Sequence, residues 1–177
     1  MRQPHRAFTL LEMLVTLGVA ATLAVLAAVA GRQWLLEARM VGTVNGLVHA
    51  IHLARAAALA EAREVVLCRS VDGTQCAPAG DWSSGWLVFV NHDGDEPAMV
   101  DAGERILAAS GRLPLVSIRS NRRAYALRPH ALRATNGTLI FCDERGHAGA
   151  RALILSYSGR PRLSRRAADG GALQCAG

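Results

Sequence analysis

The segment 158–166 (SGRPRLSRR) carries the densest group of chemically active side chains in the chain. It contains Arg160, Arg162, Arg165 and Arg166 and no acidic residue, so no neighbour in sequence neutralises the four guanidinium groups. A guanidinium stays charged at every physiological pH and forms paired hydrogen bonds to phosphate oxygens. The segment therefore predicts either a surface that binds polyanions such as DNA or a solvated basic loop that keeps the domain soluble.

Turn-forming residues predict that this segment is a loop. Gly159 and Pro161 follow directly after a run of β-prone residues, and both residue types favour turns. No aromatic residue is interleaved with the arginines, so the sequence does not indicate base stacking. If all four arginines contact phosphates, the logarithm of the binding constant on duplex DNA falls with log salt at a slope of about −3.6.

The basic charge of the chain is concentrated in the same half. The 177 residues carry a formal net charge of +6, and all 20 basic residues are arginine. Residues 1–104 contain 7 arginines and 11 acidic residues, whereas residues 105–177 contain 13 arginines and 3 acidic residues. Five further arginines can extend the basic surface if the fold brings them alongside it: Arg119, Arg122, Arg123, Arg128 and Arg133.

Catalytic and metal-binding patterns are weak by comparison. The sequence has no nucleophile elbow, phosphate-binding loop or His-Glu-x-x-His motif, so we expect no enzymatic activity and no cofactor. The acidic segment 91–96 lacks EF-hand spacing, and its Asp93-Gly94 pair is typical of a hairpin turn. His49 and His52 lie three residues apart on a predicted helix, without a third ligand nearby. We therefore expect no metal site.

A lone carboxylate, Glu12, lies at the start of a long apolar run. The seven-residue segment before Phe8 is basic, with Arg2 and Arg6 and no acidic residue, and residues 13–30 contain no charged side chain. With residues 8–11 included, a helix of this length crosses a hydrocarbon core of about 30 Å, with the basic leader in the cytoplasm. The alternative is a secretory signal peptide removed before Gly31, because residues 28–30 read Ala-Val-Ala. The length of the run and the presence of Glu12 count against it.

Four cysteines form an even set: Cys68, Cys76, Cys142 and Cys175. Their spacing does not match a zinc site, and three pairings are possible in principle. In an exported protein such a set usually forms disulfides. Given the predicted export, we interpret the set as the bridges Cys68–Cys76 and Cys142–Cys175.

A long helix followed by short strands must position these residues. Apolar residues recur at helical spacing between residues 32 and 63, and no proline occurs between residues 8 and 64, which predicts one helix that continues past the membrane. Short β-prone runs separated by turn residues follow at 65–68, 85–90, 115–118, 138–142 and 152–157. This order predicts an α+β protein in which the helix packs on an antiparallel sheet.

The segment Ala7-Phe8-Thr9-Leu10-Leu11-Glu12 resembles the processing motif of type IV pilins and type II secretion pseudopilins. The resemblance implies that a prepilin peptidase cuts between Ala7 and Phe8, with Ala7 in place of the more usual glycine, and that the new Phe8 amine is methylated. It also implies that Glu12 pairs with the N-terminal amine of a neighbouring subunit during assembly, which offsets the cost of a buried carboxylate.

By this resemblance the chain is a type IV pilin-like protein of four segments. Residues 1–7 are the leader peptide, residues 8–31 the transmembrane and assembly half of the helix, residues 32–64 its periplasmic half, and residues 65–177 a β-rich globular domain. We expect a single-pass protein of the inner membrane of a Gram-negative bacterium, with a periplasmic C-terminal domain, before incorporation into an extracellular pilus.

The rest of the chain resembles the FimT/FimU branch of minor pilins, related to the pseudopilin GspH. The resemblance rests on residues 68–76 (CRSVDGTQC), on Asp81-Trp82 and on residues 85–89 (GWLVF). Gly159-Arg160-Pro161-Arg162 is similar to the Gly-Arg-x-Arg motif of FimT-type pilins. That similarity implies non-specific DNA binding in natural transformation, with Arg165 and Arg166 helping. The alternative is a FimU-like or GspH-like structural subunit that primes pilus assembly or type II secretion without binding DNA. Both roles imply other major and minor pilins as partners.

Overall fold

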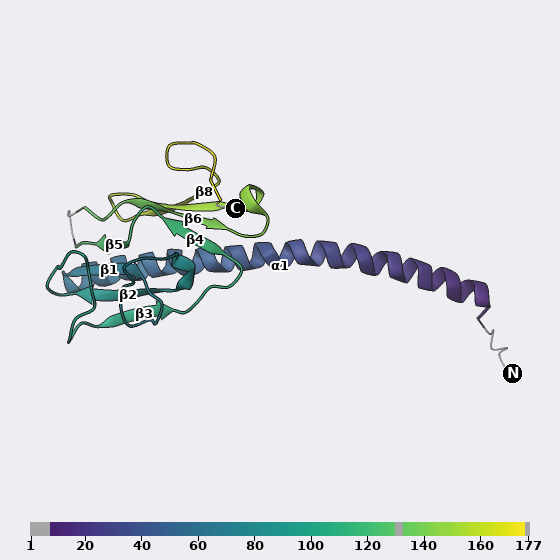
Figure 1. The fold of residues 1–177 in the computed structure, drawn as a ribbon, viewed down its shortest axis with the longest axis horizontal. Coiled ribbons are helices and arrows are strands. Elements are labelled where there is room, and N and C mark those ends of the chain that lie inside the picture. Colours follow the sequence, from purple (N-terminus) through teal and green to yellow (C-terminus); the bar gives the residue numbers. More distant parts are fainter. Residues whose placement is uncertain (1–7, 130–132, 176–177) are drawn as a thin grey trace. The chain divides into compact units, whose positions relative to one another are not determined.

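The computed structural model describes residues 8–129 and 133–175 and contains two compact units, Met1–Arg39 and Met40–Gly177. The helix α1, Leu10–Glu61, contributes its first part to one unit and its last part to the other (Figure 1). The prediction of one long helix without interruption is therefore confirmed. The predicted leader, residues 1–7, lies outside the described residues.

In the first unit, α1 exposes apolar side chains along its length. Between Leu10 and Leu26 the large apolar side chains are 53–82% exposed. An 18-residue stretch of the helix has a mean hydropathy of 2.4, so the helix is long and apolar enough to cross a membrane. The hydroxyls of Thr16 and Thr22 donate to backbone carbonyls one turn earlier, at 3.0 and 2.8 Å. These two polar groups therefore need no water and are compatible with lipid surroundings.

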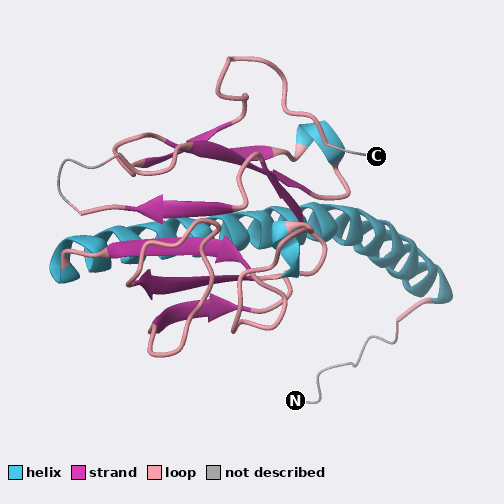
Figure 2. Ribbon diagram, turned by 60° about the vertical axis from the view of Figure 1, so that its left-hand side comes forward, coloured by secondary structure: helices cyan, strands magenta, loops and turns pink. Residues whose placement is uncertain are grey.

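The second unit contains two four-stranded antiparallel sheets beside the end of α1 (Figure 2). The first sheet has the order β3-β2-β1-β5, with β1 at Glu64–Arg69, β2 at Trp86–Asn91, β3 at Ile106–Ser110 and β5 at Ala124–Leu127. The second has the order β4-β6-β7-β8, with β4 at Ser117–Ser120, β6 at Gly137–Cys142, β7 at Arg151–Leu155 and β8 at Pro161–Ser164. Two short 3-10 helices, Trp82–Ser84 and Gly146–Ala148, lie in the connections.

The core of the second unit forms where one face of α1 meets both sheets. Helix residues spaced three or four apart, including Met40, Leu47 and Ile51, are completely buried. This spacing keeps them on one side of the helix, whereas every second residue of a strand faces inward. The strand residues in this cluster are Val65, Leu67, Trp86, Val88, Val90, Ile118, Tyr125, Leu127, Leu139, Phe141, Leu153 and Leu155.

The structure corrects three expectations about the strands. Two sheets are present instead of one, and the sequence missed the short strands β3, β5 and β8. The expected loop is wrong over Pro161–Ser164, which pairs with β7 as strand β8. β3, β5 and β8 each lie at the end of a sheet. β3 and β8 are partly exposed, and β5 is only four residues long, so none of them gives a long apolar run in the sequence. Proline is tolerated at the first residue of such a strand, as Pro161 is here.

Both predicted disulfides are present, one on the outer face of each sheet. Cys68–Cys76 belongs to a cluster with Val66 and Phe89 on the first sheet, and its Cα atoms are 5.7 Å apart. Cys142–Cys175 lies over the second sheet, with Cα atoms 5.9 Å apart, and holds the C-terminal segment against the outer side of β6 and β7.

Candidate functional sites

Glu12 takes part in a hydrogen-bonded cap at the start of α1. Its Oε2 accepts hydrogen bonds from the Thr9 backbone N–H at 3.1 Å and from the Thr9 hydroxyl at 3.2 Å. The Glu12 N–H in turn donates to the Thr9 hydroxyl oxygen at 3.2 Å. This arrangement is a capping box, which satisfies two free backbone donors of the helix start reciprocally. Among the described residues, Oε1 has no hydrogen-bond partner, so it can accept a second donor.

The interpretation of Glu12 from sequence overlooked this cap, although its signal is present. Thr-x-x-Glu before an apolar run is the pattern of a capping box, and residues 9–12 match it. Phe8, which follows the predicted cleavage point, has a 77% exposed side chain. Ala7, on the other side of that point, lies outside the described residues, so cleavage and methylation stay predictions.

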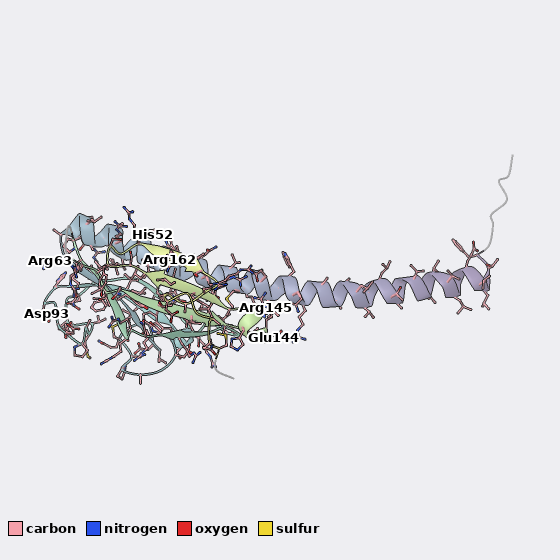
Figure 3. The ribbon with its side chains drawn as sticks, turned by 90° about the horizontal axis from the view of Figure 1, so that it is seen from above. His52, Arg63, Asp93, Glu144, Arg145 and Arg162 are labelled. Carbon is pink, nitrogen blue, oxygen red and sulfur yellow. A yellow bond between two sulfur atoms is a disulfide. The ribbon has the colours of Figure 1, made fainter. Side chains whose placement is uncertain are left out.

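The four arginines of segment 158–166 lie before, within and after β8. Arg160 precedes the strand, Arg162 lies within it, and Arg165 and Arg166 follow it. All four are exposed, and in the part of the chain that the structure describes none is paired with an acidic side chain. Arg162 is labelled in Figure 3, and its register partner on β7 is Ile154. Because Ile154 belongs to the outer cluster, Arg162 also points to the outer side of the sheet.

Gly159 shapes the turn between β7 and β8. Its φ of +69° favours glycine, and a Cβ at this position would lie 3.1 Å from Cδ1 of Leu127. The Gly159 N–H donates to the Ser156 carbonyl at 2.9 Å, and the Ser156 N–H donates to the Arg160 carbonyl at 3.2 Å. Since Gly159 is buried, its role in the motif is to position the arginines on either side of Pro161.

A segment distant in sequence lies against this turn. The Ala134 N–H donates to the Tyr157 carbonyl at 2.9 Å. The Arg133 guanidinium lies over the Tyr157 ring, with Cζ 5.6 Å from the ring centroid. Nη1 of Arg128 donates to the Arg133 carbonyl at 3.0 Å. The structure thus brings Arg128 and Arg133, two of the five additional arginines, beside the turn that carries Arg160.

The helix contributes one further arginine. The turn packs on Arg55 of α1, whose Cδ would lie 3.8 Å from a Cβ on Gly159. Sequence reasoning missed Arg55, because the contact depends on how α1 packs under the turn. We define the arginine surface as the arginines in and next to this turn: Arg55, Arg128, Arg133, Arg160 and Arg162, of which Arg162 points to the outer side of the sheet. Within it, Arg128 also pairs with Glu64, with 2.6 Å between Nε and Oε2.

Arg122 and Arg123 line a groove of about 480 Å³ on the outer face of the first sheet. Arg128 lies at the same groove, which therefore adjoins the arginine surface. Asp95 and Glu96 line it as well, so the charges of the groove are mixed. Mixed charge weakens the attraction for an anion, and we do not include the groove in the arginine surface.

Arg119 is not brought to the arginine surface. Its guanidinium donates to the backbone carbonyl of Gln174, near the C-terminal disulfide. Arg165 and Arg166 follow β8 and begin the C-terminal segment, where Nη1 of Arg166 donates to the Gly170 carbonyl at 3.3 Å. The basic half of the chain is therefore divided between a surface around the β7–β8 turn and a smaller group near residues 165–175.

The remaining polar candidates form no complete site. Asp93, Asp95 and Asp101 each offer an oxygen within 4.8 Å of the others, and Asp93 lies at one edge of the second unit (Figure 3). Exposed acidic groups of this kind are common without an ion. The expected hairpin turn at Asp93-Gly94 is wrong, because these residues lie at a bend within the long connection from β2 to β3, with Gly94 at a φ of +71°. His49 and His52 are exposed on α1 and belong to no cluster of metal-ligand side chains among the described residues.

Comparison with known proteins identifies the family. The family model of the type II transport protein GspH matches residues 43–159, and the model of the prokaryotic N-terminal methylation motif matches residues 2–28. No curated protein sequence matches the chain.

Two crystal forms of the type IV minor pilin FimU from Pseudomonas aeruginosa are similar in structure. One has a TM-score of 0.54 at 18% identity, covering 71% of this chain and 87% of the FimU chain. The other has a TM-score of 0.51 at 18% identity, covering 68% and 88%. At this level of identity the similarity establishes the fold.

The motif and the apolar helix together place the protein in the inner membrane, anchored by α1, before assembly in a Gram-negative secretion or pilus system. The pilin fold and the methylation motif are those of structural proteins that assemble with other pilins and are processed by prepilin peptidase. The chain therefore belongs to the GspH family and is a non-enzymatic minor pilin or pseudopilin with an N-terminal methylation motif.

Proposed function

We propose that this subunit primes the assembly of a type IV pilus or a type II secretion pseudopilus through α1 and Glu12. The observation that carries the proposal is the state of the Glu12 carboxylate. Glu12 is the sole charged residue between positions 8 and 31, and its cap uses one carboxylate oxygen and leaves the other unpartnered among the described residues. A carboxylate beside hydrocarbon is costly without a cation, and the N-terminal amine of a neighbouring subunit is a suitable one.

The cap allows the charge of Glu12 to be tested separately from its helix-capping role. Glu12→Gln keeps an oxygen that can accept the Thr9 hydrogen bonds but removes the charge, whereas Thr9→Ala removes the hydroxyl of the cap and keeps the charge. Each variant replaces the chromosomal copy in the native host, and its amounts in the membrane and in sheared surface fibres are measured by immunoblot. We expect Glu12→Gln to remain in the membrane and Thr9→Ala to enter the fibres. Incorporation of Glu12→Gln at the original level would overturn the proposal.

A second function, non-specific DNA binding, is supported by the arginine surface. Its support is the convergence of Arg55, Arg128 and Arg133 on the turn that carries the Gly-Arg-x-Arg motif, where Arg160 and Arg162 are exposed without acidic partners among the described residues. Closely spaced guanidiniums that lack counter-charges favour phosphate groups, which they bind with a strong dependence on salt. We infer that Arg160 and Arg162 bind the DNA backbone, helped by Arg165 and Arg166.

The salt dependence of DNA binding tests this second function. Full-length protein in mild detergent is titrated with a labelled duplex at several salt concentrations. Contacts from Arg160, Arg162, Arg165 and Arg166 contribute about −3.6 to the log–log slope, and the double variant Arg160→Ala/Arg162→Ala lowers the magnitude of the slope by about 1.8. The matched control is Arg105→Ala/Arg112→Ala, which removes the same charge before and after β3 in the other sheet. If both double variants have the same salt slope, Arg160 and Arg162 do not contact the DNA.

Deletion of the gene separates the two functions in the cell. Loss of pili or of secretion, with a protein that does not bind DNA, supports a purely structural role. Normal piliation combined with failed transformation supports a role in DNA uptake.

A further inference from the structure

Tyr157 is an exposed aromatic residue next to Arg133 of the arginine surface. Its side chain is 56% exposed, so it contributes little to the core. It lies in the turn between β7 and β8, three residues before Arg160. The segment 158–166 contains no aromatic residue, so base stacking was not expected from the sequence. The Tyr157 ring lies immediately before that segment, and its partner Arg133 is distant in sequence.

The Arg133 guanidinium and the Tyr157 ring lie together and offer two surfaces for stacking. The guanidinium lies 5.6 Å from the ring centroid, and the backbone of Arg133 is held by the hydrogen bond from Arg128 at 3.0 Å. The backbone of Tyr157 is held by the Ala134 N–H at 2.9 Å. An aromatic ring and a guanidinium plane are the two surfaces on which unpaired nucleobases stack in proteins that bind single strands.

A duplex gains little from such a site, because a side chain must first unstack its base pairs. In double-stranded DNA the faces of the bases are covered by their neighbours, and the duplex offers the protein mainly its phosphates and groove edges. The arginines of the surface serve a duplex and a single strand alike, whereas an exposed ring flanked by arginines gains contacts from an unpaired base alone. The charges and the ring together therefore favour one form of nucleic acid.

We propose that the arginine surface is a binding site for single-stranded DNA, in which a base stacks on Tyr157 beside Arg133 while Arg160 and Arg162 bind the flanking phosphates. This inference rests on the DNA-binding function proposed above. It adds a preference for the single-stranded form of DNA and a residue, Tyr157, that contacts a base and not the phosphate backbone.

The test compares three labelled probes of about twelve nucleotides, within the range of single-strand site sizes. They are oligo-dT, a single strand of the same length made of abasic nucleotides, and a duplex. Binding to the full-length protein in detergent is followed by fluorescence anisotropy at fixed salt. Because oligo-dT and the abasic strand carry the same phosphates, their difference in affinity reports contacts to the bases. We expect oligo-dT to bind about tenfold or more tightly than the abasic strand.

Variants at Tyr157 assign that difference to the ring. Tyr157→Leu keeps an apolar side chain without the aromatic face, so the affinity for oligo-dT should fall to that for the abasic strand. Tyr157→Phe keeps the ring and should retain the difference. A purely structural role for Tyr157 would lower the affinity for all three probes together.

The possible failures are distinguishable. If none of the probes binds, the DNA-binding function itself is wrong. If oligo-dT and the abasic strand bind equally, or if Tyr157→Leu leaves their ratio unchanged, the arginines bind DNA through phosphates alone and the stacking site is refuted.

Discussion

The two disulfides close loops of very different length, and we predict that they stabilise the protein unequally. Cys142–Cys175 spans a sequence separation of 33 residues, whereas Cys68–Cys76 spans 8. A disulfide stabilises mainly by restricting the unfolded chain, and the restriction grows with the logarithm of the loop length. The chain-entropy relation gives about 3.7 kcal/mol for the longer loop and about 2.5 kcal/mol for the shorter loop at room temperature.

Local packing should affect the comparison little. Each bridge joins one buried cysteine, Cys68 at 0% or Cys142 at 6% exposure, to a partner of intermediate burial. Replacing both cysteines of a bridge by alanine therefore removes similar contacts in the two cases. The double variant Cys142→Ala/Cys175→Ala should be less stable than Cys68→Ala/Cys76→Ala by about 1 kcal/mol.

Urea unfolding followed by tryptophan fluorescence measures this difference. Trp82 and Trp86 are 1% and 8% exposed in the second unit, so their emission reports the unfolding of that unit. The m-value of each variant should be fitted separately, because a chain without a cross-link exposes more surface when it unfolds. As a control, a reducing agent should bring the parent protein and both variants to similar stability. An equal or larger loss from Cys68→Ala/Cys76→Ala would refute the argument from loop length.

Three further predictions concern other parts of the chain. Burial raises the pKa of Tyr125 to about 12. The contribution of Tyr125 to the free energy of unfolding should therefore be constant below pH 10, the ordinary pKa of tyrosine, and fall between pH 10 and 12; Tyr125→Phe should remove this fall. Gly85 has a φ of +132°, and a Cβ there would lie 2.6 and 2.7 Å from two backbone carbonyl oxygens, so Gly85→Ala should cost about 2 kcal/mol or more in urea unfolding; no measurable loss would contradict the described turn. Trp34 is 72% exposed, in contrast to the other two tryptophans, and lies just beyond the apolar run, as interfacial anchors do. Lipids brominated near the headgroup should quench its fluorescence in vesicles, and Trp34→Phe should abolish that quenching; quenching that persists in the variant would place another tryptophan at the membrane.

Features encoded by neighbours in sequence were predicted well. The uncharged run after Glu12 and the helical spacing that follows it determine α1, because a helix forms hydrogen bonds within one segment. The strands that contribute most to the core, β1, β2, β6 and β7, were also visible as apolar runs. The end strands β3, β5 and β8 were not, since β3 and β8 are partly exposed and β5 is only four residues long.

The arginine surface shows the opposite case. The sequence by itself determined that four arginines without acidic neighbours follow the last apolar strand. It did not determine that Arg55, Arg128 and Arg133 lie beside them, or that Arg133 lies over Tyr157. Those contacts join segments that are brought together by strand pairing and by packing of α1, and both depend on the register of many residues at once. The tertiary structure alone therefore decided which of the twenty arginines share a surface and that an aromatic ring lies among them.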